Sequence, residues 1–353
     1  MPLVRTIRRL SRRDPAVRAI ARSWRELTGG TARGRDSARR TLIACSGGSD
    51  SSALVLALAS AAADPHETFV VAHVVHDLRP EAEALADRDA VRRLAESLDL
   101  PFVEVPVAVR GQRGNHEGVA RRLRYGALER LARENRCRYL ATAHQADDQL
   151  ESLLMALIRG SGPRGLAGVA ASRRLPTCRV IRPMLELTRA DSERLCRDAD
   201  WSWRDDATNR DESRLRAALR AQVMPALERL RPGASRRAAR AARLMSGAAR
   251  LVGEHAAMVA ERASCDGGFA WDRRELRRAP EVVIGEALRR AAACLNEGAC
   301  RDRIGIKLAC PAVRAIRAHA TDPKRFAWPG VDLLVDSRRV VMCKSGLPAS
   351  TKA

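Results

Sequence analysis

Residues 42–52, LIACSGGSDSS, constrain the fold of this chain more than any other stretch. The first of them form a short apolar run that predicts a buried strand, and the run ends at two adjacent glycines. Residues 51–63 are rich in alanine and leucine and predict a helix. A strand, a glycine turn and a helix N-terminus together form an anion site, because backbone N–H groups can approach a phosphate closely there. The sequence therefore predicts a phosphate-binding loop.

The side chains of this loop strengthen the prediction. Hydroxyl groups add hydrogen-bond donors around a phosphate, and a carboxylate at Asp50 can hold a magnesium ion against it. The loop has neither the lysine of a G-x-x-x-x-G-K-S/T loop nor the spacing of G-x-G-x-x-G. We expect phosphate contacts from Ser46, Gly47, Gly48, Ser49, Asp50 and Ser51, with Asp50 also as the metal ligand.

The S-G-G-x-D-S wording of the loop resembles the pyrophosphate loop of the ATP pyrophosphatases. Those enzymes cleave ATP between the α and β phosphates and transfer AMP. The resemblance implies ATP and Mg²⁺ as cofactors. The alternative is a serine- and glycine-rich turn without function, and the strand and helix on either side weigh against it.

The composition points to a polyanionic partner. The net charge is +22, the pI is near 11.1, and 60 of the 64 basic residues are arginine. Such a chain binds phosphates with release of counterions. At 353 residues with 46% hydrophobic content, it is long enough for two or three domains with cores of their own. No apolar run approaches the roughly 20 residues needed to cross a bilayer, so we expect no membrane span.

Nine cysteines are scattered singly, without a C-x-x-C pair. This pattern argues against a disulfide framework, a zinc ribbon or a typical iron–sulfur site, and it favours a reducing compartment. We therefore expect a cytoplasmic protein with no metal site besides the magnesium.

From residue 41 onward, predicted strands and helices alternate. The predicted strands after the first are residues 68–75, 102–107 and 138–142, and the helices are 80–98, 118–135 and 146–159. Alternation of this kind predicts an α/β fold with a doubly wound, Rossmann-like parallel sheet covered on both faces. Ligands of such sheets lie beyond the carboxyl ends of the strands. Residues 46–51, 73–79 and 142–148 follow strand ends, so we expect them to line one crevice.

Three further segments identify a family. VVHDLRP at residues 74–80 resembles its V-x-H-G-L-R-P turn, EGVARRLRY at 117–125 its E-x-x-A-R-x-x-R-Y helix, and LATAHQADDQLES at 140–152 its L-A-T-A-H-H-x-D-D-Q-x-E-T segment. Together with the loop, they resemble the tRNA(Ile)-lysidine synthetases of the PP-loop superfamily over residues 41–230. Asp77 departs from the glycine that the family has in its turn, so we expect that turn to differ in shape.

The resemblance implies a reaction. The family adenylates O2 of the wobble cytidine of an isoleucine tRNA with a CAU anticodon, and the amine of free L-lysine then attacks C2 and displaces AMP. Asp148 and Glu151 lie three apart on one helix and suit a lysine ammonium, while Arg121 suits charge on the α-phosphate. The expected catalytic residues are Asp50, Arg121, Asp148 and Glu151. The expected tRNA-binding residues are Arg124, Arg159, Arg164, Arg216 and Arg220. An ordinary solvated helix face is the alternative for the acidic pair, Asp148 and Glu151, and for the basic pair, Arg121 and Arg124.

The resemblance and the composition together predict four segments. We expect residues 1–40 to form a basic N-terminal extension, for which a targeting segment is the alternative. Residues 41–211 are expected to form the PP-loop ATP-binding catalytic domain, and residues 212–232 a linker helix. Residues 233–353 are expected to form a C-terminal tRNA-binding region. This last region is predicted to be mostly helical, with a small α+β end whose hairpin turns at residues 336–338.

Two other functions stay open from the sequence. One is a cytidine-thiolating PP-loop enzyme of tRNA, and the other is a non-catalytic basic RNA-binding protein. His76 and His144 are equally compatible with a base contact or a structural role, and Asp147 with a catalytic or a structural one. A homodimer is also kept open, because the sequence does not give the oligomeric state.

Overall fold

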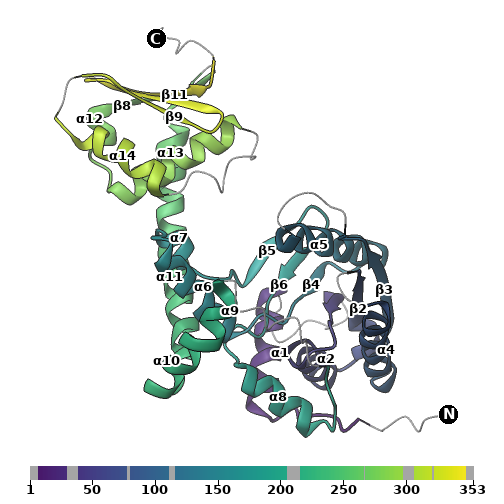
Figure 1. Cartoon of the computed structure of the whole chain (residues 1–353). Helices are drawn as coiled ribbons and strands as arrows, with labels where there is room; N and C mark the ends of the chain where they lie inside the picture. Colours follow the sequence, from purple (N-terminus) through teal and green to yellow (C-terminus); the bar gives the residue numbers. More distant parts are fainter. Residues whose placement is uncertain are drawn as a thin grey trace. The chain divides into compact units, whose positions relative to one another are not determined.

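The computed structural model describes residues 7–29, 39–77, 80–110, 116–204, 215–265, 267–296, 306–319 and 322–346 (Figure 1). Backbone packing divides the chain into two compact units. Unit 1 comprises Met1–Ser152 with Val169–Arg240, and unit 2 comprises Leu153–Gly168 with Ala241–Ala353. The sequence placed a boundary at residues 232–233, whereas the division found here falls inside one long helix, between Arg240 and Ala241.

Unit 1 is built on a six-stranded sheet with the strand order β3-β2-β1-β4-β6-β5. The four predicted strands are parallel, as expected, and the sequence did not predict two more: β6, which continues the parallel set, and the edge strand β5, which runs antiparallel to β6. The strands are β1 (Thr41–Ala44), β2 (Phe69–His76), β3 (Phe102–Val107), β4 (Tyr139–Ala141), β5 (Ser172–Arg174) and β6 (Arg179–Ile181). The chain runs outward from β1 in one direction and continues from β4 in the other, so the topological switch point lies between β1 and β4.

Helices cover both faces of this sheet (Figure 1). The covering helices are α1 (Pro15–Leu27), α2 (Ser49–Ala61), α4 (Glu81–Ser97) and α8 (Arg189–Asp198) on one face and α5 (His116–Glu134) on the other. The short helix α3 (Pro65–Thr68) precedes β2, and α6 (Ala146–Ile158) follows β4 and is divided between the two units. Successive strand residues point to opposite faces, and both neighbours Leu42 and Ile43 are fully buried. Ile43 packs with α1, α2, α4 and α8, and Leu42 packs with α5. The doubly wound parallel fold predicted from the alternation is confirmed.

Helix α1 belongs to the core of unit 1, although the sequence assigned it to an extension. Its apolar side chains Val17, Ile20 and Trp24 are at most 1% exposed and pack in the same cluster as α2. Trp24 donates from its indole N–H to Thr41 Oγ1 at 3.1 Å, at the first residue of β1. The loosely helical spacing of these residues in the sequence therefore marks a buried face.

The predicted linker helix is present from residue 215 to residue 230, but it is not regular. It consists of α9 (Leu215–Ala218), the π-helical turn η3 (Leu219–Val223) and α10 (Met224–Leu230). Pro225 lacks the N–H that would continue the bonding of a regular helix into the preceding turn, and the wide turn lies directly before it. The long helix α11 (Ala234–Glu261) follows.

Unit 2 contains a five-stranded antiparallel sheet packed against helices. The strand order is β7-β8-β11-β10-β9. The strands are β7 (Ser264–Cys265), β8 (Gly268–Asp272), β9 (Lys324–Trp328), β10 (Val331–Val335) and β11 (Arg339–Lys344). The helices besides α11 are α7 (Pro163–Leu166), α12 (Arg273–Leu276), α13 (Glu281–Leu295) and α14 (Ile306–Arg317).

The small α+β end predicted from the sequence is confirmed. Val335 pairs with Val340 across the predicted hairpin, and the Asp336 carboxylate accepts from the backbone N–H groups of Arg338 and Arg339. The sequence predicted two strands here, and the structure has three. A turn at Pro329 and Gly330, with φ of +75° at the glycine, separates β9 from β10.

In the part of the chain that the structure describes, no helix is both long and apolar enough to cross a membrane.

Candidate active site

The predicted phosphate loop connects β1 to the N-terminus of α2. Gly47 has φ of +91°, a backbone conformation that favours glycine, and Gly48 precedes the first residue of the helix. Gly48 supplies no side-chain cap, so the first N–H groups of α2 stay available for an anion. The Ser51 hydroxyl accepts from the Ser46 N–H at 3.1 Å and also donates to the Gly48 carbonyl at 3.1 Å. These bonds hold the loop in a fixed shape.

A cavity of 370 Å³ opens beside this loop, at the switch point of the sheet. Its walls come from the segments at the ends of β1, β2 and β4, from α5 and from Arg204. The lining includes Ser46, Gly48, Asp50, Ser51, His73, His76, Arg124, Tyr125, Thr142, His144, Asp148 and Arg204. The structure therefore brings together the strand-end segments that the sequence predicted to converge. Gly47 and Ser49 are buried behind the lining.

Asp50 lies at the second position of α2 with one carboxylate oxygen uncompensated. Its Oδ1 atom is buried and has no hydrogen-bond partner among the described residues. Burial raises the pKa of this carboxyl to about 6, although Arg189 and the Ser192 hydroxyl lower it. A carboxylate oxygen that is buried without a partner at a phosphate loop fits a divalent cation, which would supply the missing charge. The donor set is therefore compatible with magnesium.

On the α5 side of the cavity, Tyr125 lies between two guanidinium groups. The Arg121 and Arg173 guanidiniums lie 5.2 and 5.1 Å from the centre of its ring. Both arginines are exposed, but Arg124, which the sequence assigned to tRNA, lines the cavity, whereas Arg121, which it assigned to catalysis, lies beside the lining residue Tyr125 without lining the cavity itself. The geometry thus gives Arg124 the more direct access to a bound phosphate.

Sequence reasoning missed Arg182 as a member of this basic cluster. It is 4% exposed, donates to the Ala170 carbonyl at 2.6 Å and reaches the Tyr125 hydroxyl at 3.5 Å. The signal was available, since Arg182 stands directly after β6 and parallel strands bring their ends to one edge. Arg182, Arg121 and Arg124 also act on His144. Burial, followed by these charges, lowers the pKa of His144 to about 3, so the imidazole is neutral.

The acidic pair on α6 is compensated by the predicted tRNA-binding arginines of the linker helix. Glu151 is 5% exposed, and its carboxylate pairs with Arg220 and, at 3.2 Å, with Arg216. Asp148 lines the cavity and lies 3.3 Å from Arg220, and its other oxygen accepts from the Gln145 N–H at 2.9 Å. Burial raises the pKa of the Asp148 carboxyl. The structure therefore places Arg216 and Arg220 at the acidic pair.

Two other carboxylates have structural partners. Asp147 accepts from the Ser235 hydroxyl at 2.8 Å and from the Arg189 N–H at 2.9 Å, so it connects the starts of three helices. Asp77 accepts from the Val109 N–H at 2.7 Å and thereby ties the end of β2 to the end of β3. A glycine could not make this contact. The two residues that follow Asp77 in the predicted turn lie outside the described residues.

Two of the predicted tRNA-binding arginines belong to unit 2. Arg159 is exposed just after α6, and Arg164 lies in α7 with its guanidinium 3.8 Å from the Glu286 carboxylate. Their assignment to tRNA stays a prediction.

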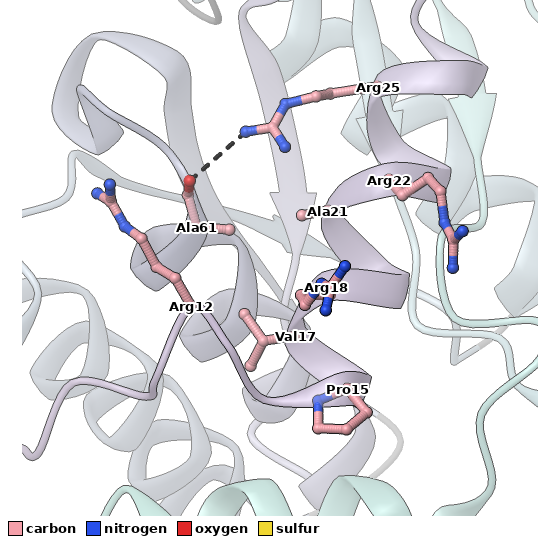
Figure 2. Close-up of a pocket in the computed structure, with 8 residues that line it drawn as sticks. All are labelled: Arg12, Pro15, Val17, Arg18, Ala21, Arg22, Arg25 and Ala61. Carbon is pink, nitrogen blue, oxygen red and sulfur yellow. Dashed lines mark hydrogen bonds between the residues drawn. The ribbon is translucent and has the colours of Figure 1, made fainter. Parts of the chain in front are cut away.

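A second hollow of unit 1, of 610 Å³, lies at the far end of α2 from the phosphate loop (Figure 2). Arginines from α1 and the segment before it dominate its lining: Arg12, Arg18, Arg22 and Arg25. Arg12 donates to the carbonyls of Ser60 and Ala62, so it caps the C-terminus of α2. The buried face of α1 thus serves the core, and its arginine face gives the basic surface that the sequence predicted for this segment.

Cysteines do not gather into a ligand set in the described part of the chain. Cys45, Cys137, Cys178 and Cys196 are buried as free thiols. Among the described residues, no group of three or more His, Cys, Asp or Glu side chains is arranged to hold a metal ion.

Comparison with known proteins assigns the family. Residues 18–227 match the family model of the PP-loop domain, a span longer than half of the chain. The chain belongs to the PP-loop family. Membership implies that the protein uses ATP.

Several relatives of this PP-loop chain carry one name. The chain is 38% identical over 237 residues to the tRNA(Ile)-lysidine synthase of Rhodopirellula baltica, covering 62% of this chain and 58% of that protein. It is 40% identical over 207 residues to the tRNA(Ile)-lysidine synthase of Thermus thermophilus, covering 56% and 38% respectively. The chain therefore spans less than two thirds of the length of either relative.

A solved structure supports the fold. The U34-tRNA thiolase of Methanococcus maripaludis superimposes with a TM-score of 0.52 at 17% identity, over 66% of this chain and 81% of the thiolase. At that identity the likeness concerns the PP-loop fold alone.

Proposed function

We propose that this PP-loop protein is a tRNA(Ile)-lysidine synthetase of the cytoplasm. It would use ATP to activate the wobble cytidine of an isoleucine tRNA with a CAU anticodon, and it would join free L-lysine to C2 of that base. The names of the relatives at 38% and 40% identity support this assignment. The observation that carries it is that Asp148 lines the same cavity as the phosphate loop.

In the first step, cytidine O2 attacks the α-phosphorus of ATP, an O–P bond forms, and pyrophosphate leaves. The N–H groups at the start of α2, that of Ser51 among them, and the hydroxyl of Ser46 would bind the phosphates. Arg124 lines the cavity and would stabilise negative charge that develops on the α-phosphate, with Arg121 as the predicted second cation. A magnesium ion held by Asp50 would neutralise charge on the phosphates.

In the second step, a lysine amine attacks C2 of the base, and the C2–O2 bond breaks with release of AMP. Asp148 would hold the ammonium group of lysine beside the activated base. Its contact with Arg220, at 3.3 Å, is longer than that between Glu151 and the same guanidinium. An ammonium can therefore replace Arg220 at Asp148 while Arg220 and Arg216 keep Glu151 compensated. The ammonium has no lone pair, so it first loses a proton, to Asp148 or to solvent, to become the attacking amine. A second proton leaves the nitrogen for solvent once the C2–N bond has formed.

The basic surface suits the tRNA partner. The net charge of +22 and the arginines that line the hollow beside α1 are consistent with contacts to an RNA backbone. Arg159 and Arg164 remain predicted contacts to the RNA backbone. With tRNA and free lysine as its substrates, the protein would act in the cytoplasm, where tRNA is modified.

Mass analysis of the tRNA product tests the proposal. Unmodified CAU-anticodon isoleucine tRNA is incubated with the protein, Mg²⁺-ATP and isotope-labelled lysine, and the anticodon fragment is weighed. We expect the wobble nucleoside to gain the mass of lysine less one water. Asp50→Asn should lower the rate about 10²-fold or more, while Asp198→Asn, an exposed carboxylate on α8, should not. A labelled product that contains sulfur, or no change of mass, would contradict the proposal.

A further inference from the structure

Helix α11 leaves a row of large apolar side chains exposed. Leu244, Leu251 and Met258 are 76%, 56% and 46% exposed. They are seven residues apart, so they lie in one line along the helix. Exposed apolar side chains that recur in a line are a feature of interaction surfaces, whereas scattered ones are not.

The residues between them complete a heptad pattern. Ala241, Ala248 and His255 stand at alternating spacings of three and four from the three large residues, which is the a/d spacing of a coiled-coil seam. The seam is distinct from the face with which α11 packs into unit 2, where Ala242, Ala256 and Ala260 are buried. This part of the helix therefore has two apolar faces, and unit 2 covers one of them.

We propose that this seam pairs with α11 of a second copy of the chain, in antiparallel orientation. The inference does not depend on the reaction proposed above. Antiparallel pairing about a point between Ala248 and Leu251 alternates small residues with large ones. It places Ala248 against Leu251 of the second copy, Ala241 against Met258, and Leu244 against His255. Small-against-large layers fill the space between two helices without voids.

Charges beside the seam favour the same orientation. Arg240 and Glu261 lie on one flank, near opposite ends of α11, and neither is ion-paired with another described residue. Antiparallel pairing brings Arg240 next to Glu261 of the second copy at both ends of the interface, whereas parallel in-register pairing would place Arg240 against the uncharged Met245. Gly247 lies on the same flank, and no atom lies within 4 Å of the position that a Cβ atom would occupy there. A partner helix can therefore approach closely at this glycine.

Sedimentation equilibrium of the full chain tests the pairing. We expect a mass of about twice 38.6 kDa at micromolar concentration. The double variant Leu244→Glu and Leu251→Glu should raise the dimer dissociation constant at least about 100-fold, with an unchanged circular dichroism spectrum. The matched control is Leu230→Glu on α10, where an 82% exposed leucine lies off the seam. A monomeric wild-type chain, or equal weakening by the control, would overturn the proposal.

Charge reversal tests the orientation independently of the leucines. Arg240→Glu and Glu261→Arg should each weaken the dimer several-fold, and the two changes combined in one chain should restore it, because each pair is then reversed. In a chain whose accessible native cysteines are changed to serine, Ala241→Cys together with Met258→Cys should form cross-linked dimers with a short bis-maleimide, and Ala241→Cys alone should not. Cross-linking through Ala241→Cys alone would exclude the antiparallel arrangement. Dimers that form only when tRNA is added would show that RNA, not the seam, holds the copies together.

Discussion

At the scale of residues, the crevice is organised by how each buried charge is compensated. Glu151 is nearly inaccessible and has two guanidinium partners. Asp148 faces the cavity and shares one of these guanidiniums at a longer distance. Asp50 has an oxygen with no partner among the described residues. Of these three carboxylates, Asp50 and Asp148 are therefore placed to take a cation from solution, which separates their roles from that of Glu151.

Asp148→Asn should affect lysine more than ATP. The substitution keeps the shape of the side chain and removes the charge that would hold the ammonium group. We expect the KM for lysine to rise at least about 10-fold and the KM for ATP to change less than about 3-fold. Steady-state AMP formation with each substrate varied in turn measures both. An equal rise of the two constants would mean that Asp148 acts on the whole site.

His144 should make unit 1 sensitive to acid. Its folded-state pKa of about 3 lies below the ordinary value of 6.5, so the unfolded chain binds a proton more readily. Stability from the neutral imidazole is fully present above pH 6.5 and is lost as the pH falls from 6.5 toward 3. The loss should reach about 1 kcal/mol per pH unit in that window.

Urea unfolding of the wild type and of His144→Asn at pH 7.0, 5.5 and 4.5 measures this dependence. The wild type should lose more stability than the variant between pH 7.0 and 4.5. Parallel losses in the two proteins would show that His144 does not carry the effect.

Most of these residues could be named from the sequence, since the motif and the strand ends place them at one edge of a parallel sheet. The partners of the acidic pair, Asp148 and Glu151, could not be named from the sequence. Arg216 and Arg220 stand more than 60 positions from Glu151, and no local pattern tells whether a helical arginine turns toward a carboxylate or toward solvent. The choice between Arg121 and Arg124 likewise depends on the rotation of α5 on the sheet, which the spacing of two arginines does not fix.

At the scale of elements, α1 connects the N-terminal region to the phosphate loop. Its Trp24 ring packs 5.1 Å from the ring of Phe69 at the start of β2, and its indole N–H bonds to the start of β1. Because β1 leads directly into the phosphate loop, this helix supports the strand that positions it. The arginine content of the segment concealed this role, since basic residues near a chain end also suit an extension or a targeting segment.

Trp24→Ala should destabilise unit 1 by about 3–5 kcal/mol, because it leaves a cavity where a side chain is 1% exposed. Arg22→Gln on the exposed face of the same helix should change stability by less than about 0.5 kcal/mol. Urea unfolding of both variants makes the comparison. A Trp24→Ala protein as stable as the Arg22→Gln protein would mean that α1 is dispensable for the fold.

At the scale of the whole molecule, the alternation of strands and helices predicted the doubly wound fold of unit 1 and four of the six strands of its sheet, because long helices separate these apolar runs. It missed β5 and β6, which have three residues each and are too short for a pattern. The division between the units was harder to predict. Residues 232–233 resemble a boundary because proline and glycine end helices, yet the change of unit falls inside the 28-residue α11. A continuous helix carries no break in composition where its packing partners change, so only tertiary contacts reveal the division.

The proposed function requires that one crevice activates a cytidine with ATP and then lets free lysine attack the activated base. The most direct measurement is AMP release from Mg²⁺-ATP by the purified protein, with CAU-anticodon isoleucine tRNA, at increasing concentrations of free lysine. We expect turnover that requires the tRNA, rises with lysine to saturation, and falls about 10²-fold or more in Asp50→Asn. AMP release that is independent of lysine, or none with any tRNA while salt-sensitive RNA binding persists, would contradict it.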